Sequence, residues 1–370
     1  MKALACWILL ASIAFPPALR AEIKLLAVAK IPGADIDKSN LTDNLEEGTP
    51  HNRLGGFGSA IAHLEGNRYV LLPDRGPKDG ASRYQCRFQI ADLTLQGETL
   101  KFELKETVIL RDSSGQPFLG DQHNLARRLD SEGVAISKQG TVYVSDEYGP
   151  KILEFNRKGK LLRDFPIPEH FLIANPSGHP SKEAKAGKGR SPNRGFEGLT
   201  RTPGGKLVAM LQSPLLQDDA FFGVNTRILE LDPQTLRTRE FVYQRDGGKH
   251  GMNEILALSD TEFLVLERDT ASGKNRFCKI FRISTAAASD VSKVAQLPTT
   301  GLPMGIVAVS KTPFLDLTKF GLSLPEKVEG LCFGPNLADG RRLLLVTTDN
   351  DFTEQPSQIY AFAVDEADLR

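Results

Sequence analysis

Short apolar runs separated by turn residues recur along most of this chain. Four such runs follow Glu132, reading GVAIS, TVYVSDE, KILEFN and LLRDFPIP, with KQG, YGP and RKG between them. Runs of this length bounded by turn residues indicate strands joined by tight turns. Four runs recur after Glu197, three and a less regular stretch follow Glu254, and three follow Glu329. An earlier unit that begins GSAIAHL keeps the plan without the acid, so the pattern predicts a repeated four-stranded unit.

Repeated four-stranded meanders are typical of a β-propeller, and loops of different length explain the unequal spacing of the units. The last unit has one run too few, whereas the run EIKLLAVAKI near the N-terminus is left over. We expect residues 23–31 to pair with the strand around Ile359–Val364, which closes the ring and removes a sheet edge. We predict an all-β propeller over residues 22–370. Five blades are visible, and the 285–325 region leaves room for a sixth.

The N-terminus has the pattern of a targeting segment. Lys2 precedes the apolar run ALACWILLASIAF, and small residues follow in PPALRA. The run is too short to cross a bilayer, so residues 1–21 are interpreted as a secretory signal peptide. We therefore expect an exported protein, periplasmic or secreted. No later segment has enough consecutive apolar residues for a membrane span.

Composition narrows the functional classes. The 370 residues include 46 Lys plus Arg and 46 Asp plus Glu, and this neutral balance gives no support for a nucleic-acid partner or a membrane-surface patch. We expect a monomer. Three cysteines follow the targeting segment, Cys86, Cys278 and Cys332, and no C-x-x-C pair is present. They allow at most one disulfide, and we expect small buried core residues.

Four glutamates precede the first strand of their units and are candidate catalytic residues: Glu132, Glu197, Glu254 and Glu329. The innermost strand of each propeller blade lines the central channel, so these side chains should ring the axis. Converging carboxylates repel each other unless a cation, bound protons or arginines offset them. Hard oxygen ligands in this number suit Ca²⁺. The alternative is that each glutamate caps the backbone of the neighbouring blade.

The second strands of the units end in polar residues, and two of these ends combine an acid with an arginine, at Asp74-Arg75 and at Glu267-Arg268-Asp269. Arginine binds phosphate or carboxylate in a bidentate manner. Acids interspersed with arginines fit a metal-bridged anionic substrate. The alternative is a set of turn residues and intramolecular ion pairs.

Several long motifs resemble the phytase-like family, whose description is esterase-like activity of phytase: LPDRGP, DSEGVAIS, VSDEYGP, NRGFEGLT, NEILAL, FLVLERD and VEGLCFGPNLADGRRLLLVTTDNDF. The resemblance covers almost the whole chain after the targeting segment. It implies a secreted or periplasmic propeller that hydrolyses phosphate or other esters. Calcium-dependent propeller phytases, to which the family is distantly similar, hold Ca²⁺ with clustered carboxylates and grip phosphate with Lys and Arg.

Carried over to this chain, the resemblance implies metal ligands at Asp74, Asp146, Glu147, Glu267, Asp349 and Asp351. It implies substrate-binding arginines at Arg75, Arg194 and Arg268. The first unit departs from the pattern, because Gly58 stands where its channel acid would be.

Other signals are weaker. The chain has no G-x-S-x-G, H-E-x-x-H, Walker or G-x-G-x-x-G motif. His123 is a candidate acid or base, although a lone loop histidine is more often simply exposed. The loop 35–46 partly matches a calcium-loop template, and a plain polar loop is the preferred interpretation. The basic loop 175–195 is interpreted as a solvated, disordered loop or as a lid over an anion.

We therefore expect an exported, metal-dependent ester hydrolase, with Ca²⁺ as cofactor and a small anionic phosphoester as substrate. The alternatives are a non-catalytic periplasmic binding or scaffold propeller and a calcium-dependent lactonase, because the fold alone does not separate these functions.

Overall fold

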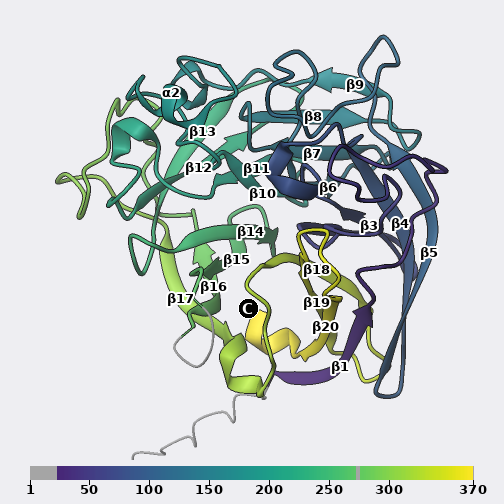
Figure 1. The fold of residues 1–370 in the computed structure, drawn as a ribbon. Coiled ribbons are helices and arrows are strands. Elements are labelled where there is room, and N and C mark those ends of the chain that lie inside the picture. Colours follow the sequence, from purple (N-terminus) through teal and green to yellow (C-terminus); the bar gives the residue numbers. More distant parts are fainter. Residues whose placement is uncertain (1–22, 272–275, 370) are drawn as a thin grey trace, which may run out of the picture.

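Five four-stranded antiparallel sheets are arranged around a central axis in the computed structural model, which describes residues 23–271 and 276–369 (Figure 1). From the axis outward, blade 1 contains β2 (Ala60–Glu65), β3 (Arg68–Leu72), β4 (Arg87–Gln96) and β5 (Thr99–Ile109). Blade 2 contains β6 (Ser131–Ile136), β7 (Val142–Asp146), β8 (Lys151–Phe155) and β9 (Leu161–Asp164). Blade 3 contains β10 (Phe196–Arg201), β11 (Leu207–Leu211), β12 (Asn225–Leu231) and β13 (Thr238–Gln244).

The ring continues with two further blades. Blade 4 contains β14 (Gly251–Ala257), β15 (Glu262–Arg268), β16 (Cys278–Ser284) and β17 (Ser310–Asp316). Blade 5 contains β18 (Val328–Asn336), β19 (Arg342–Thr348), β20 (Ser357–Val364) and β1 (Lys24–Ile31). The α-helices of the described chain are two single turns in loops, α1 (Pro77–Gly80) and α2 (Pro180–Ala184). The predicted all-β propeller is confirmed.

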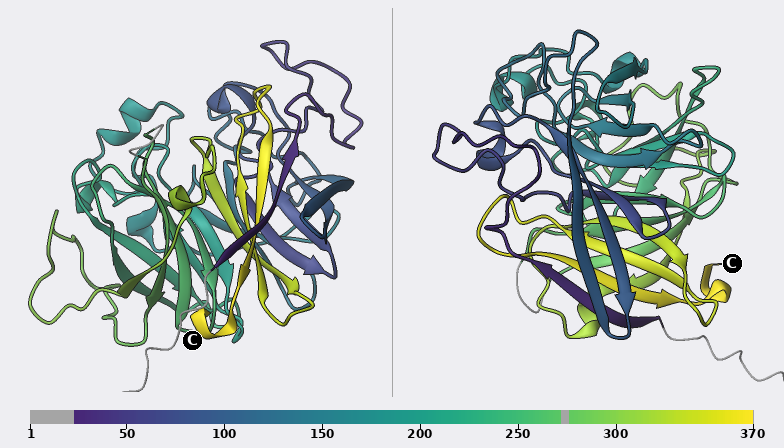
Figure 2. Two further views of the ribbon diagram at one scale, coloured as in Figure 1. Left: turned by 90° about the horizontal axis from the view of Figure 1, so that it is seen from below. Right: turned by 90° about the vertical axis from the view of Figure 1, so that its right-hand side faces the viewer.

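The N-terminal strand closes the ring, as predicted. β1 pairs antiparallel with β20 from Lys24 opposite Ala363 to Ile31 opposite Ser357, and the two strands lie side by side in both views of Figure 2. Ile31 and Ala29 are buried in the apolar cluster shared by blades 5 and 1. The first and last strands of the chain thus complete one sheet, in which β1 covers the outer edge of β20.

Residues 23–271 and 276–369 form five blades and no sixth. The 285–325 region supplies β17 as the outer strand of blade 4. The segment before β17 runs along the outer edge of blade 3, where the Val291 N–H donates to Glu240 O and the Val309 N–H donates to Val242 O, both at 2.9 Å. Apolar residues of this segment, among them Val291 and Leu297, form one cluster with Val242 of β13, so the segment extends an existing blade.

Apolar residues fill the spaces between adjacent blades. Leu264 and Leu266 of blade 4 pack with Leu344 and Val346 of blade 5 in one such cluster. The cysteines Cys86, Cys278 and Cys332 are all free and buried, which agrees with the preferred interpretation as core residues.

The predicted signal peptide, residues 1–21, lies outside the described residues and remains a prediction. Within the described part of the chain, no helix has the length and apolar character needed to cross a membrane.

We expect Ile31→Ala to lower the free energy of unfolding by roughly 2–5 kcal/mol, because it leaves a cavity at the closure between blades 5 and 1. The matched control is Lys30→Ala, which changes an exposed neighbour on the same strand and should stay within about 0.5 kcal/mol of wild type. Urea denaturation of both variants measures the difference. Equal stability of the two variants would contradict a closure that depends on β1.

Candidate functional site

Glycines let the inner strands approach one another closely around the axis. Three of the four channel glutamates are followed by glycine, at Gly133, Gly198 and Gly330. A Cβ on Gly133 would lie 2.6 Å from the Glu197 carbonyl oxygen of the next blade, and a Cβ on Gly198 would lie 2.7 Å from the Ile255 nitrogen. No side chain fits into such spaces, so glycine is required there. The close approach places the neighbouring glutamates in a region with almost no solvent.

Glu197 and Glu329 lie close to each other near the axis, and both are buried. One oxygen of Glu197 accepts hydrogen bonds from the side-chain amides of Gln212 and Asn253, the latter at 3.1 Å. One oxygen of Glu329 accepts from Arg268 Nη2 at 2.6 Å. The second oxygen of each carboxylate finds no hydrogen-bond partner among the described residues. Burial raises the pKa of Glu197 to about 7, and the neighbouring Glu329 adds to the rise.

A second carboxylate group lies at the top of blade 2. Oxygen atoms of Asp130, Glu132 and Glu147 lie within 4.8 Å of one another and could hold a metal ion. Burial, with the neighbouring carboxylates adding, raises the pKa of both Glu132 and Glu147 well above the usual range. Arg75 partly compensates this charge, because its Nη1 donates to Asp130 and lies 3.4 Å from Glu147 Oε2. The other oxygen of Glu147 is buried without a partner in the described chain.

A third carboxylate group consists of Asp74, Asp349 and Asp351, and a lysine side chain lies among them. The ligand oxygens of these residues lie within 4.8 Å of one another. The Lys327 ammonium contacts all three side chains and lies 3.1 Å from Asp349 Oδ2 and 3.7 Å from Asp74 Oδ2. Burial raises the pKa of Asp74 and of Asp349 to about 7 despite the lysine. Lys327 therefore already occupies part of the space that a metal ion would take.

Glu254 caps the backbone of the neighbouring blade, which was the alternative interpretation of the four glutamates. Its Oε1 accepts the backbone N–H of Leu199 in blade 3 at 3.1 Å and its own neighbour Ile255 N–H at 3.0 Å. Glu254 thus caps the backbone of the adjacent blade, and the structure does not direct its carboxylate to the Glu197–Glu329 pair. The following residue is isoleucine instead of glycine, which distinguishes this glutamate from the other three.

Two expected metal ligands are fully used in other contacts. Both oxygens of Asp146 accept backbone N–H groups, from Asp130 and Tyr148 on one oxygen and from Gly149 on the other. The two oxygens of Glu267 together accept four donors, which are Asp246 N, His250 Nδ1, Tyr243 Oη and Lys311 Nζ. Both carboxylates thus hold neighbouring groups in place through hydrogen bonds, Asp146 with three donors and Glu267 with four.

The three expected substrate-binding arginines differ in their partners. Arg75 is committed to carboxylates and to Asn193, and Arg268 forms an ion pair with Glu329. Arg194 contacts only the Gln212 side chain, through its Nη1, and forms no ion pair in the described chain. All three lie at or beside the axial carboxylates, and Arg194 is the least committed.

Sequence reasoning missed three residues that shape the site: Asp130, Lys327 and Asn253. A signal for two of them was present, because Asp130 and Lys327 each stand two residues before a channel glutamate. Alternate residues of a strand share a face, so an ionisable residue at this spacing faces the same region. Asn253 carried no such signal, because its role depends on contact with Glu197 of another blade. Gln212 stands at the polar end of a second strand, where the pattern placed polar residues, but its contact with Glu197 was not predicted.

A comparison of the chain with family models identifies the phytase-like family, described as esterase-like activity of phytase, over residues 52–352. The chain belongs to this family. A relative in Arthroderma benhamiae, named an uncharacterized secreted protein, is 28% identical over 60% of this chain, and the chain spans only 60% of that relative's length.

Solved structures match this phytase-like chain only at low similarity. The tail fiber of Staphylococcus aureus phage P68 has a TM-score of 0.43 at 14% identity, covering 94% of this chain and 54% of the other. A GH43 β-1,3-galactosidase has a TM-score of 0.43 at 11% identity, covering 88% and 94%. Virginiamycin B lyase of Staphylococcus aureus has a TM-score of 0.36 at 11% identity, covering 93% and 100%. None of these similarities supports an argument about function.

The basic loop of this phytase-like chain is ordered, which corrects the expected disorder of residues 175–195. It contains α2, and Glu183 anchors it from a buried position. The Glu183 carboxylate pairs with Arg190 at 2.9 Å and with Arg128 at 3.4 Å, and it accepts the backbone N–H groups of Ser177 and Gly178. One buried acid among many cations thus holds the loop against the propeller.

The calcium-loop template in residues 35–46 is not realised as a ligand set. Asp37 pairs with Arg87 at 2.6 Å, Asp43 with His51 at 3.2 Å, and Glu46 with Arg83. The acids face three different partners, so the preferred interpretation as a polar loop is retained. His123 is exposed and lies beside the His179 ring, as expected for a loop histidine.

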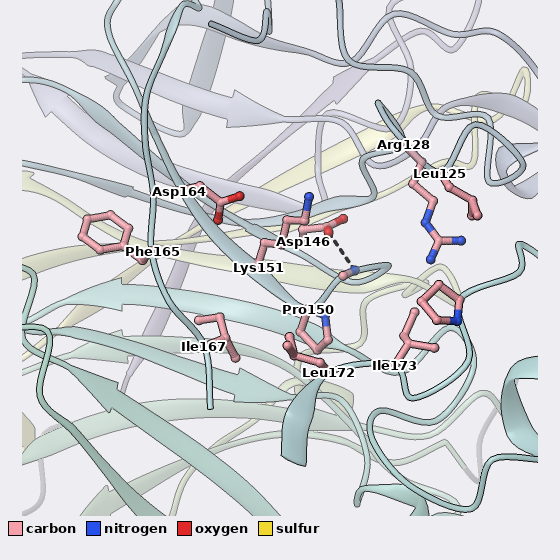
Figure 3. A pocket seen from close by; sticks show the side chains of 12 residues that line it. Leu125, Arg128, Asp146, Pro150, Lys151, Asp164, Phe165, Ile167, Leu172 and Ile173 are labelled. Carbon is pink, nitrogen blue, oxygen red and sulfur yellow. Dashed lines mark hydrogen bonds between the residues drawn. The ribbon is translucent and has the colours of Figure 1, made fainter. Parts of the chain in front are cut away.

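A separate pocket of about 390 Å³ lies on the outer side of Asp146 (Figure 3). Lys151 lies between Asp146 and Asp164 there, and Phe165, Ile167 and other apolar residues line the remaining wall (Figure 3). Because both oxygens of Asp146 accept backbone hydrogen bonds, this carboxylate does not join the pocket to the axial acids.

We expect Glu254→Gln to preserve folding, because the amide oxygen can still accept the Leu199 N–H. Burial raises the pKa of Glu254 well above its value of 4.5 in the unfolded chain. As the pH rises above about 4.5, Glu254 therefore loses its proton in the unfolded state while it keeps it in the folded state. This difference lowers the free energy of unfolding increasingly with pH. The melting temperature of Glu254→Gln relative to wild type should be higher at pH 8 than at pH 5.

The matched variant is Glu254→Ala, which leaves the buried Leu199 N–H without an acceptor and should lose about 1–3 kcal/mol at both pH values. Thermal melts of the three proteins at the two pH values provide the measurement. Equal losses in the Gln and Ala variants would argue against a capping role.

Proposed function

We propose that this chain is an ester hydrolase in which the axial carboxylates bind a divalent cation such as Ca²⁺ and act on a phosphoester or related ester. The observation that carries the proposal is the set of orphaned carboxylate oxygens near the axis. Glu147 Oε1, Glu197 Oε2 and Glu329 Oε2 are buried and have no hydrogen-bond partner among the described residues. Buried polar atoms are normally paired, so orphaned ones suggest a missing ligand.

The charges near the axis support the same proposal. Seven buried carboxyl groups lie there: Asp74, Asp130, Glu132, Glu147, Glu197, Glu329 and Asp349. Three cations, Arg75, Arg268 and Lys327, pair with them. Acids that outnumber cations in a desolvated site must bind protons or a further cation. The donors of the described chain are all oxygens, which fits a hard ion such as Ca²⁺ better than a thiolate-binding metal.

Of the two acid groups whose oxygens lie within 4.8 Å of one another, the group of Asp130, Glu132 and Glu147 contains a partnerless oxygen, Glu147 Oε1, and is the better candidate to hold such an ion. Glu197 and Glu329 each have one further oxygen without a partner in the described chain. A bound divalent cation would polarise the ester oxygen and lower the pKa of a bound water. The chain's own groups would do the rest. Gln212 and Asn253 fix the orientation of Glu197, and its pKa of about 7 suits a group that accepts a proton from an attacking water near neutral pH.

Membership of the family supports a hydrolytic role, since its description is esterase-like. Two other functions remain as alternatives, a non-catalytic binding or scaffold propeller and a calcium-dependent lactonase. A screen of phosphoesters, carboxylic esters and lactones, each with Ca²⁺ and with EDTA, separates the three functions. Turnover of any ester supports the proposal, turnover of lactones alone supports the lactonase, and no turnover supports the binding protein.

We also propose that the protein is exported, to the periplasm or the medium. The sequence pattern of residues 1–21 and the name of the Arthroderma benhamiae relative as a secreted protein support this proposal. Fractionation of cells that produce the full chain tests it.

We expect Ca²⁺ to raise the melting temperature, because a ligand that binds only the folded state stabilises it. The gain is about 2.7 kcal/mol when free Ca²⁺ is a hundred times Kd. Differential scanning calorimetry with Ca²⁺, with Mg²⁺ and with EDTA measures the effect. The double variant Glu197→Gln/Glu329→Gln should lose most of the gain, whereas Glu254→Gln should retain it. A melt that does not respond to Ca²⁺ or EDTA would exclude a stabilising metal site.

We expect Glu197→Gln to lower kcat by about 10²–10⁴-fold, because it removes a positioned proton acceptor while preserving shape. Arg268→Lys should behave differently. It retains a positive charge but loses the planar fork, so binding of an anionic substrate should weaken while Ca²⁺ still stabilises the protein. Turnover and melting temperature are measured on the same purified variants. Wild-type turnover in Glu197→Gln would remove this residue from the mechanism.

A further inference from the structure

A pocket beside the axis carries several cationic groups and no acid. It has a volume of about 520 Å³, within the usual range for small-molecule sites. It lies between the anchored basic loop and the loop that joins blades 3 and 4. Its polar lining includes Arg194, Arg245, Lys249, His250 and Ser213. None of the described residues that line it is an aspartate or a glutamate.

The protein compensates the cations of this pocket only in part. Arg194, Arg245 and Lys249 form no ion pair with any carboxylate of the described chain. The charge of Arg194 acts on Glu147 and Glu197, and His250 pairs with Glu267. Burial and the nearby Arg194 lower the pKa of Arg245 to about 10, although Glu267 acts in the opposite direction. Like charges held together with incomplete compensation favour the binding of an anion.

Two buried donors point to the same ligand class. Arg245 is only 5% exposed and is fixed by the carbonyl oxygens of His250 and Gly223, which leaves its Nε without a partner in the described chain. Ser213 is also 5% exposed, and its hydroxyl finds no partner there either. A preorganised guanidinium N–H and a buried hydroxyl are suitable donors to an oxyanion.

The pocket also has an apolar wall. Phe221 lines it with 67% of its surface exposed, and the adjacent Phe222 is 76% exposed. The residues of α2 contribute a further side through Pro180 and Ala184. An inorganic anion alone would leave the Phe221 ring in water, whereas an organic anion would cover it.

The pocket adjoins the axial carboxylates through one amide. Arg194 Nη1 donates to Gln212 Oε1, and Gln212 Nε2 donates to Glu197. The Arg194 guanidinium and the Gln212 amide thus link the pocket to Glu197 through two hydrogen bonds.

We propose that this pocket binds the anionic end of the substrate, an oxyanion of phosphate or carboxylate type carried on an apolar group, while the ester bond lies at the axis. This inference rests on the proposed hydrolase function. It narrows the substrate class to esters with one anionic and one apolar part, and it assigns Arg245, Lys249 and Ser213 to recognition.

The test measures anion binding directly, without turnover. Isothermal titration with inorganic phosphate, phenyl phosphate and benzoate is performed on the purified wild-type chain in EDTA at fixed ionic strength. The variants are Lys249→Glu and Arg194→Met, and the matched control is Lys138→Met, which changes an exposed lysine in a turn of blade 2. Circular dichroism verifies folding, and Lys249→Glu alters an exposed side chain, so it should fold normally.

We expect phenyl phosphate or benzoate to bind more tightly than inorganic phosphate. Each variant should weaken that binding roughly tenfold or more, while Lys138→Met leaves it unchanged. Binding of phenyl phosphate alone identifies a phosphate ligand, and binding of benzoate alone identifies a carboxylate. Wild-type affinity in Lys249→Glu and Arg194→Met, or no binding of any of the three anions, overturns the proposal.

The same variants separate this inference from the proposed hydrolase function. Anion binding that depends on Lys249, in a protein that hydrolyses no ester, supports the pocket and rejects the hydrolase. Ester turnover whose KM is unchanged in Lys249→Glu supports the hydrolase and rejects the pocket.

Discussion

The burial of carboxylates where the inner strands meet is the constraint on which the rest of this structure depends. Gly133, Gly198 and Gly330 allow adjacent blades to approach so closely that a Cβ at any of the three would lie within 3.2 Å of atoms outside its own strand. This packing closes the ring and excludes water from the axis. It also desolvates the glutamates that precede the glycines, so the chain cannot have the tight ring without charged groups that need compensation.

The cations of the chain compensate these carboxylates unevenly. Some carboxylates are paired with a lysine or an arginine, whereas others keep an oxygen without a partner. Lys327 contacts all three acids between blades 1 and 5, and Arg75 serves the acids above blade 2. Arg268 satisfies one oxygen of Glu329 and leaves the other without a partner in the described chain. A fold that needed only stability could have replaced these pairs with apolar residues at little loss. Under the proposed function, these orphaned oxygens are the ones that a cation would bind.

The strand pattern could be predicted from the sequence because each blade is a local meander with its own turns, and the leftover strand before residue 32 identified the closure. The position of each glutamate at the start of an inner strand was also predictable. The use of each carboxylate was not. Glu197 and Glu254 precede similar strands, yet one faces the axis and the other caps a backbone, because that choice depends on which donor of another blade lies within reach. The order of the basic loop likewise depends on Glu183 meeting Arg128, far away in sequence.

The two oppositely charged regions near the axis require a neutral residue between them, and Gln212 meets this requirement. Its amide nitrogen faces Glu197 while its amide oxygen faces Arg194, so it presents a donor to the anion and an acceptor to the cation. A carboxylate at this position would repel Glu197, and an ammonium would repel Arg194. Either would also neutralise one of the two regions. With an amide, the axis remains negative and the adjoining pocket remains positive over the length of one side chain. That polarity would orient an ester with one anionic end, because only one direction of binding places its charge against the cations.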